Sequence, residues 1–191
     1  MRTPVFLCFI VCFSLASCVK EEKQLPKTGN PITVVAANSD TIPDKAVLKL
    51  KLVKDSTNCD ETAFLFDHAA SLSYTPAEDA IYFQGFGAVS LSSISSDGTW
   101  MAINKLPYSP GMVVGLDFYT KTDGDFFLQI SYINKIPPGI QIWLRDNYLR
   151  DSVNLRKVHY NFNVIKTDTN SFGRNRFKVI LRDSSIQASI H

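Results

Sequence analysis

Apolar and polar residues alternate with a period of two along much of the chain, and this pattern constrains the fold more than any other feature. Leu48, Leu50 and Leu52 are separated by lysines, which is typical of a strand with one buried and one solvated face. Residues 114–118 repeat the alternation. No stretch of ten or more residues shows the 3.6-residue periodicity of an amphipathic helix. The sequence therefore predicts an all-β protein with essentially no helix beyond its apolar N-terminal segment.

Turn signals separate the predicted strands at near-regular intervals. Ser96-Asp97-Gly98 predicts a turn, and Asp123-Gly124 predicts a hairpin, because an Asp-Gly pair adopts positive φ at low cost. Pro137-Pro138-Gly139 interrupts the pattern before a further strand. Many short strands at this spacing favour a sandwich or barrel. Strands are expected at residues 48–52, 63–66, 89–91, 100–103, 114–118, 126–132, 140–144, 160–164 and 177–181.

Composition excludes several classes of function. A net charge of +2 without a long basic stripe argues against a nucleic-acid partner. Among the cysteines only Cys59 lies in the body of the chain, and His68, His159 and His191 are scattered, so neither a disulfide framework nor a metal quartet is expected. We predict no metal and no cofactor. Cys59 is either a small buried residue, which we favour, or a free surface thiol.

The N-terminus has the anatomy of a secretory signal peptide over residues 1–17. Arg2 supplies the positive charge, residues 4–13 form an apolar run, and small residues follow. A transmembrane anchor is the alternative interpretation. It is disfavoured because the run is well short of the roughly 20 residues that span a bilayer, and charged residues 20–23 end it abruptly.

Leu15-Ala16-Ser17-Cys18 resembles the bacterial lipobox. The resemblance implies cleavage before Cys18 and acylation of Cys18, which would hold the protein on a membrane. Several acyl chains at about 0.8 kcal/mol per buried CH₂ make release negligible. The following Val19-Lys20-Glu21-Glu22 resembles the short acidic export tag of surface-exposed lipoproteins of Bacteroidetes. We expect display on the outer face of the outer membrane, with a periplasm-facing anchor as the alternative.

The mature chain is predicted to have three parts. Residues 18–44 comprise the lipidated cysteine and a tether, because prolines and glycines replace the periodic pattern. Residues 32–35 are either a piece of this tether or an added edge strand. Residues 45–183 form the β domain, and residues 184–191 form a tail.

The β domain resembles a β-sandwich domain that recurs in cell-surface and type IX-secreted proteins of Bacteroidetes. The resemblance rests on ordered segments spread over roughly residues 48–181, among them residues 60–66, 95–107, 142–149 and 175–181. It implies an antiparallel, jelly-roll-like sandwich with a structural or adhesive role and no catalytic residues. The position of the domain in the chain differs from that in the family. The family's domain normally lies near the end of a very long protein and is followed by a sorting domain, whereas here we expect it to follow a lipid anchor.

Three aromatic residues are the candidate ligand-binding residues, because exposed indole and phenol rings stack on sugars. They are Trp143, Tyr148 and Trp100. Trp143 alternates out of phase with its apolar neighbours, so it is either a binding platform or, as we favour, a ring packed beneath a loop or second layer.

No catalytic residue is predicted, because the chain has no Gly-x-Ser-x-Gly elbow and its acids lie in turn-like segments. The expected function is therefore that of a non-catalytic surface lipoprotein for adhesion, ligand capture or surface structure, with a glycan or a surface protein as ligand. A carbohydrate-binding lipoprotein accessory to glycan uptake is the first alternative. A hydrolase is the second.

Replacing Cys18 tests the anchor. Metabolic labelling with a fatty-acid analogue should mark the wild type and leave Cys18→Ala unlabelled, because the mutant lacks the acceptor thiol. Cys12→Ala, inside the apolar run, is the matched control and should be labelled like the wild type. Equal labelling of Cys18→Ala and the wild type would refute lipidation at this residue.

Overall fold

The computed structural model describes residues 41–184. The predicted signal peptide, lipidation at Cys18 and tail residues 185–191 lie outside the described residues. Within residues 41–184, no helix has both the length and the apolar character needed to cross a membrane.

Short strands build the described part of the chain, joined by turns and loops and by a single 3₁₀ turn at Thr169–Ser171. The all-β class predicted from the period-two pattern is confirmed. Each strand expected from the sequence lies within an observed one, and β3 and β9 are additional. The strands are β1 (Ala46–Val53), β2 (Cys59–Phe66), β3 (Ala80–Ile81), β4 (Val89–Ile94), β5 (Trp100–Leu106), β6 (Val113–Thr120), β7 (Gly124–Asn134), β8 (Ile140–Asp146), β9 (Asp151–Asn154), β10 (Tyr160–Val164) and β11 (Phe177–Asp183).

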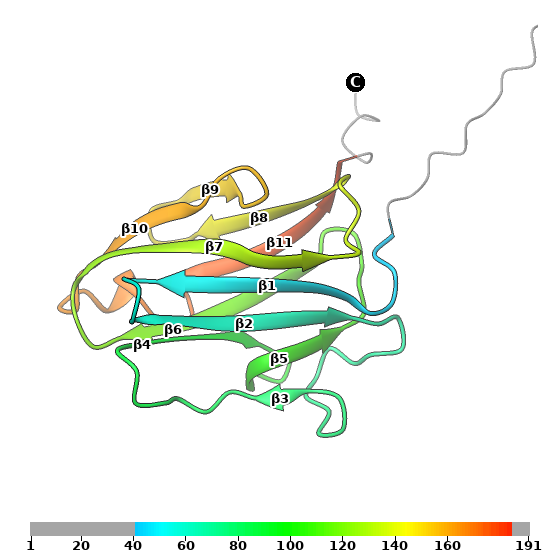
Figure 1. Cartoon of the computed structure of the whole chain (residues 1–191), viewed down its shortest axis with the longest axis horizontal. Helices are drawn as coiled ribbons and strands as arrows, with labels where there is room; N and C mark the ends of the chain where they lie inside the picture. Colours follow the sequence, from blue (N-terminus) through cyan, green and yellow to red (C-terminus); the bar gives the residue numbers. More distant parts are fainter. Residues whose placement is uncertain (1–40, 185–191) are drawn as a thin grey trace, which may run out of the picture. The chain divides into compact units, whose positions relative to one another are not determined.

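Hydrogen bonds join these strands into one sheet of order β10-β7-β1-β2-β5-β4-β6-β11-β8-β9, with β3 paired to β5. β10 and β9 are the ends of this order, yet Figure 1 shows them at the same side of the domain. The sheet is thus nearly closed, like a barrel. A division into the two separate sheets of a sandwich is not confirmed.

The expectation of a purely antiparallel sheet is wrong at one place. β2 and β5 pair in parallel, with Ala63 opposite Ile103 and Phe66 opposite Leu106. The chain between them passes through β3 and β4, and this long connection returns it in the same direction beside β2. Parallel neighbours require such a crossover, whereas antiparallel neighbours do not.

The hairpin predicted at Asp123-Gly124 is also wrong. Gly124 adopts the expected positive φ of 129°, but β6 pairs with β4 and β11, whereas β7 pairs with β1 and β10. The turn therefore connects two strands that are not neighbours. An Asp-Gly pair determines the local bend of the chain, and the partner of each strand is decided by packing.

Side chains from the inner face of the sheet form one hydrophobic core. Leu48, Leu50 and Leu52 of β1 are completely buried in it. The ring centroid of Phe177 lies 4.8 Å from that of Phe162 and 5.3 Å from that of Phe118, so β6, β10 and β11 contribute to one aromatic cluster.

The last residues of the predicted tether contact this domain. Ile42 belongs to the buried core, and Asp44 accepts a hydrogen bond from the backbone N–H of His68 at 2.8 Å. Residues 41–44 therefore lie against the domain and help to cover its apolar interior.

A buried ion pair lies where the two ends of the sheet approach each other. Arg176 donates to the Asp146 carboxylate through Nε at 3.1 Å and through Nη2 at 2.9 Å, and both side chains are fully buried. Its Nη1 donates to the backbone oxygens of Asn163, at 3.0 Å, and Ser171. The Tyr160 hydroxyl donates to the same carboxylate at 3.2 Å. One guanidinium thus ties β8, β10 and the loop before β11 together.

Arg176→Met should lower the free energy of unfolding by about 3–5 kcal/mol, because it leaves the Asp146 charge buried without its cation. Lys178→Met, on an exposed position of β11, is the matched control and should change stability by less than about 0.5 kcal/mol. Denaturant unfolding of both variants measures the difference. Equal stability of the two variants would show that the ion pair does not hold the sheet ends together.

Candidate functional site

A shallow cleft lies on the outer face of the sheet over β4 and β6. Its floor consists of two cross-strand pairs, Ser90 opposite Tyr119 and Ser92 opposite Asp117. The alternate residues of both strands point into the core, and Phe118 is one of them. Because successive side chains of a strand point to opposite faces, the same strands that build the core present these polar and aromatic groups outward.

One wall of the cleft comes from the end of β5 and from the segment after β3. Trp100 begins β5 and is 49% exposed. The backbone N–H of Tyr82 donates to the Trp100 carbonyl at 2.8 Å, which holds Phe83 and Gln84 beside the cleft. Farther along this loop, Lys121 donates to the Phe86 carbonyl at 2.9 Å. The loop is thus fixed at two points while its phenyl rings remain exposed.

The loop before β11 forms the opposite wall through Phe172 and Gly173. The Gly173 N–H donates to the Phe118 carbonyl at 2.9 Å and so attaches the loop to β6. The Lys166 ammonium lies 4.3 Å from the Tyr119 ring centroid and 3.7 Å from that of Phe172. These cation–π contacts hold the Tyr119 and Phe172 rings close to the same ammonium group.

The cleft encloses about 330 Å³, and most of its lining residues are aromatic. Among the described residues that line the cleft, Asp117 is the only one with a carboxyl group. Burial raises the pKa of Asp117, although the Arg174 charge and a hydrogen bond from the Trp100 side chain favour the ionised form. A mainly apolar hollow with a few placed polar groups is typical of a small-ligand site.

Tyr148 lies in a second hollow that shares Phe172 and Gly173 with the cleft. Its hydroxyl donates to Asp168 at 2.8 Å, and the Arg176 guanidinium lies 5.0 Å from its ring centroid. The structure therefore places two of the three aromatic candidates, Trp100 and Tyr148, in adjoining hollows.

Trp143 lies apart from both hollows, on the outer face of β8. It faces Ile180 and Asn154 across the neighbouring strands, and its indole N–H donates to Gln141 at 2.8 Å. The Arg182 guanidinium lies 5.7 Å from its ring centroid. The ring is half-buried beside side chains of the sheet itself, so it is neither a core residue nor part of the cleft.

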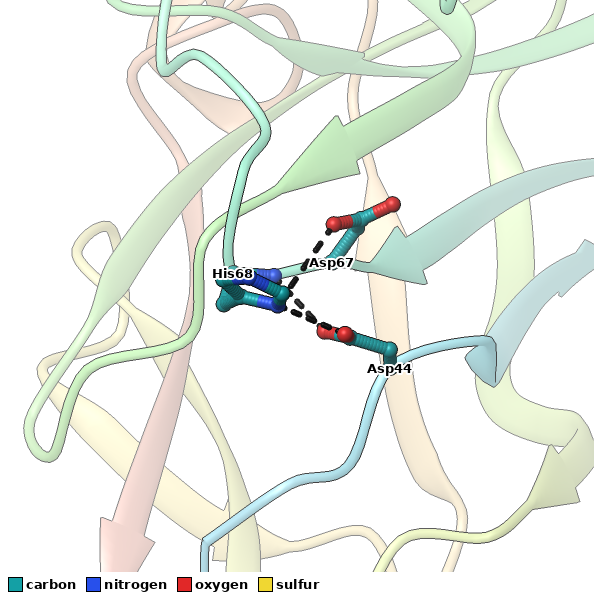
Figure 2. A group of neighbouring side chains, drawn as sticks. All are labelled: Asp44, Asp67 and His68. Carbon is teal, nitrogen blue, oxygen red and sulfur yellow. Dashed lines mark hydrogen bonds and ion pairs between the residues drawn. The ribbon is translucent and has the colours of Figure 1, made fainter.

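Asp44, Asp67 and His68 form a cluster in which one oxygen or nitrogen atom from each side chain lies within 4.8 Å of those of the other two (Figure 2). His68 Nδ1 is 2.6 Å from the Asp44 carboxylate, and Lys105 Nζ is 2.9 Å from that of Asp67. The His68 backbone N–H is the main group that lowers the pKa of Asp44. These contacts give the cluster a structural role, because they hold residues 41–44 against the loop after β2.

Sequence reasoning identified Trp100 but missed the rest of the cleft. Phe83, Phe172 and Asp117 come from two loops and a strand, and no short motif joins them. The sequence did hold one indication of the cleft. Phe83 and Phe86 lie in a glycine-containing segment in which apolar and polar residues do not alternate as they do in a strand. Aromatic residues in such a segment are candidates for exposure, and here Phe83 is 83% exposed.

No known protein family, curated protein or solved structure matched this chain. The resemblance to the Bacteroidetes sandwich domain therefore stays a prediction.

Asp117→Asn should raise the melting temperature at pH 7. The raised pKa of Asp117 means that the fold prefers the protonated carboxyl, so ionisation above the ordinary value of 3.8 lowers stability as the pH rises. The neutral amide removes this loss, and the gain should disappear as the pH falls below about 4. Asp151→Asn, on an exposed position of β9, is the control. Thermal melts from pH 3 to 8 measure both, and an Asp117→Asn protein less stable than the wild type at pH 7 would contradict this account.

Proposed function

We propose that this protein is a non-catalytic surface lipoprotein whose β domain captures carbohydrate in the aromatic cleft. The single observation that carries the proposal is that Trp100, Phe83, Tyr119 and Asp117 line one cleft. Adhesion or ligand capture was expected from the sequence, and the cleft favours a sugar as the captured ligand.

The cleft suits the two kinds of surface that a pyranose ring presents. The flat C–H face of the ring is apolar and packs on an aromatic side chain, whereas the hydroxyl groups at its rim require hydrogen-bond partners. Trp100 and Phe83 supply exposed aromatic surface, and Ser92, Gln84 and Asp117 supply polar atoms in the same hollow.

The half-buried Asp117 carboxylate is a suitable acceptor for sugar hydroxyls. Hydrogen bonds in which one partner is charged are roughly twice as strong as neutral ones. Binding of a hydroxyl donor would also offset the partial desolvation that raises the pKa of Asp117. In this role Asp117 binds the sugar and does not act as a nucleophile.

A glycosidase needs two carboxyl groups on either side of the scissile bond. Among the described residues that line the cleft, only Asp117 is acidic, so the geometry favours binding over hydrolysis. The lipid anchor proposed at Cys18 would place this cleft at the membrane surface, on the outward face or, as the alternative, facing the periplasm. Retention of a glycan there fits an accessory role in glycan uptake.

A glycan-array screen of the full-length protein in detergent tests this proposal. The wild type should bind at least one class of glycan, and Trp100→Ala should lose about tenfold or more in affinity, because it removes the stacking surface. Its melting temperature should fall less than that of Trp143→Ala, since Trp100 is more exposed than Trp143.

Trp143→Ala is the matched control, because it removes the same ring from the same sheet outside the cleft. It should keep full glycan affinity while losing about 2 kcal/mol of stability, roughly half the cost of truncating a fully buried aromatic residue. If Trp143→Ala lost glycan binding and Trp100→Ala kept it, the glycan site would lie on β8 and not in the cleft. Absence of binding to every glycan on the array would refute carbohydrate capture.

A further inference from the structure

The second hollow, which encloses about 510 Å³, has a basic and amide-rich lining. Its arginines are Arg150, Arg174 and Arg176, and its remaining polar groups include the side chains of Asn147 and Asn170. We name it the basic hollow. No acidic residue occurs among the described residues that line it.

Two of the three arginines of the basic hollow are exposed and have no ion-pair partner in the described part of the chain. Arg176 is fully buried and neutralised by Asp146, but Arg150 and Arg174 form no salt bridge with residues 41–184. Arg174 uses one N–H in a 3.3 Å hydrogen bond to the Gly98 carbonyl. A guanidinium has five N–H donors in a planar fork that matches a carboxylate or sulfate.

The acids that contact this region are already engaged. Asp168 accepts the Tyr148 hydroxyl at 2.8 Å and the Asn170 N–H at 2.9 Å, and its pKa is lowered mainly by that backbone N–H. Asp117, across in the cleft, interacts with the Arg174 charge. Neither forms a contact ion pair that would neutralise Arg150 or Arg174.

The basic hollow and the aromatic cleft adjoin each other, because Phe172 and Gly173 line both. We infer that the basic hollow binds the anionic group of an acidic glycan, a carboxylate or a sulfate ester, while an adjoining sugar ring occupies the cleft. The inference rests on the proposed function and specifies its substrate class.

Four immobilised polymers distinguish the chemistry that the full-length protein recognises. Polygalacturonate carries carboxylates on sugars, chondroitin sulfate adds sulfate esters, dextran is a neutral glycan, and polyglutamate carries carboxylates without sugar. The protein should bind one or both of the acidic glycans about tenfold or more tightly than dextran and polyglutamate.

Arg150→Gln and Arg174→Gln should each weaken acidic-glycan binding about tenfold, because each removes a charge-assisted contact while keeping an amide donor. Arg182→Gln, at an exposed position at the far end of β11, is the matched control and should bind like the wild type. Melting curves of the three variants check that each is folded.

Equal binding of the protein to polyglutamate and to the acidic glycans would overturn the inference. Acidic-glycan binding as strong as that of the wild type in both Arg150→Gln and Arg174→Gln would overturn it as well. If dextran binding still depended on Trp100, the proposed function would survive that failure. Binding that depends on the arginines but not on Trp100 would overturn the cleft proposal and the shared ligand together. Retention of none of the four polymers would overturn both.

Discussion

The buried pair of Arg176 and Asp146 is the interaction on which the rest of the structure depends. The sheet order leaves β9 and β10 without a hydrogen-bonded partner on one side, and the gap between the sheet ends needs another connection. Arg176 provides it, because one guanidinium reaches a carboxylate of β8 and a carbonyl of β10. Asp146 in turn accepts bonds from Tyr160 and from the N–H of Tyr148, so the buried charge is satisfied on all sides.

The same pair positions both hollows. The carbonyl of Ser171 accepts from Arg176, which holds the loop that places Phe172 and Gly173 between the hollows. Tyr148 lies over the guanidinium and lines the basic hollow. A charge buried in the core and satisfied by several backbone groups costs more to disturb than a surface contact. The loop that separates the aromatic cleft from the basic hollow is therefore held by a buried group, which preserves the spacing between the two hollows.

Local patterns in the sequence predicted most strands and part of the site. Alternation at Leu48, Leu50 and Leu52 marks β1, because burial of one face leaves a period of two in the residues themselves. Trp100 was one of three candidate ligand-binding residues, and it lines the cleft. The short strands β3 and β9 were missed, since a few residues carry too little periodicity to be recognised. Trp143 was expected to pack beneath a loop or second layer; its ring is half-buried, with Gln141 and Arg182 of the sheet beside it.

The sequence by itself determined the all-β class and the positions of the longer strands, because side-chain alternation is a local property of a pleated chain. It also carries the lipobox-like segment, whose prediction depends on residues 15–18 alone. Only the tertiary structure decided that β2 and β5 pair in parallel, that the Asp123-Gly124 turn joins strands that are not neighbours, and that Phe83 and Phe172 face the same cleft. These features depend on which distant strands pack together, and no short window of sequence records that choice.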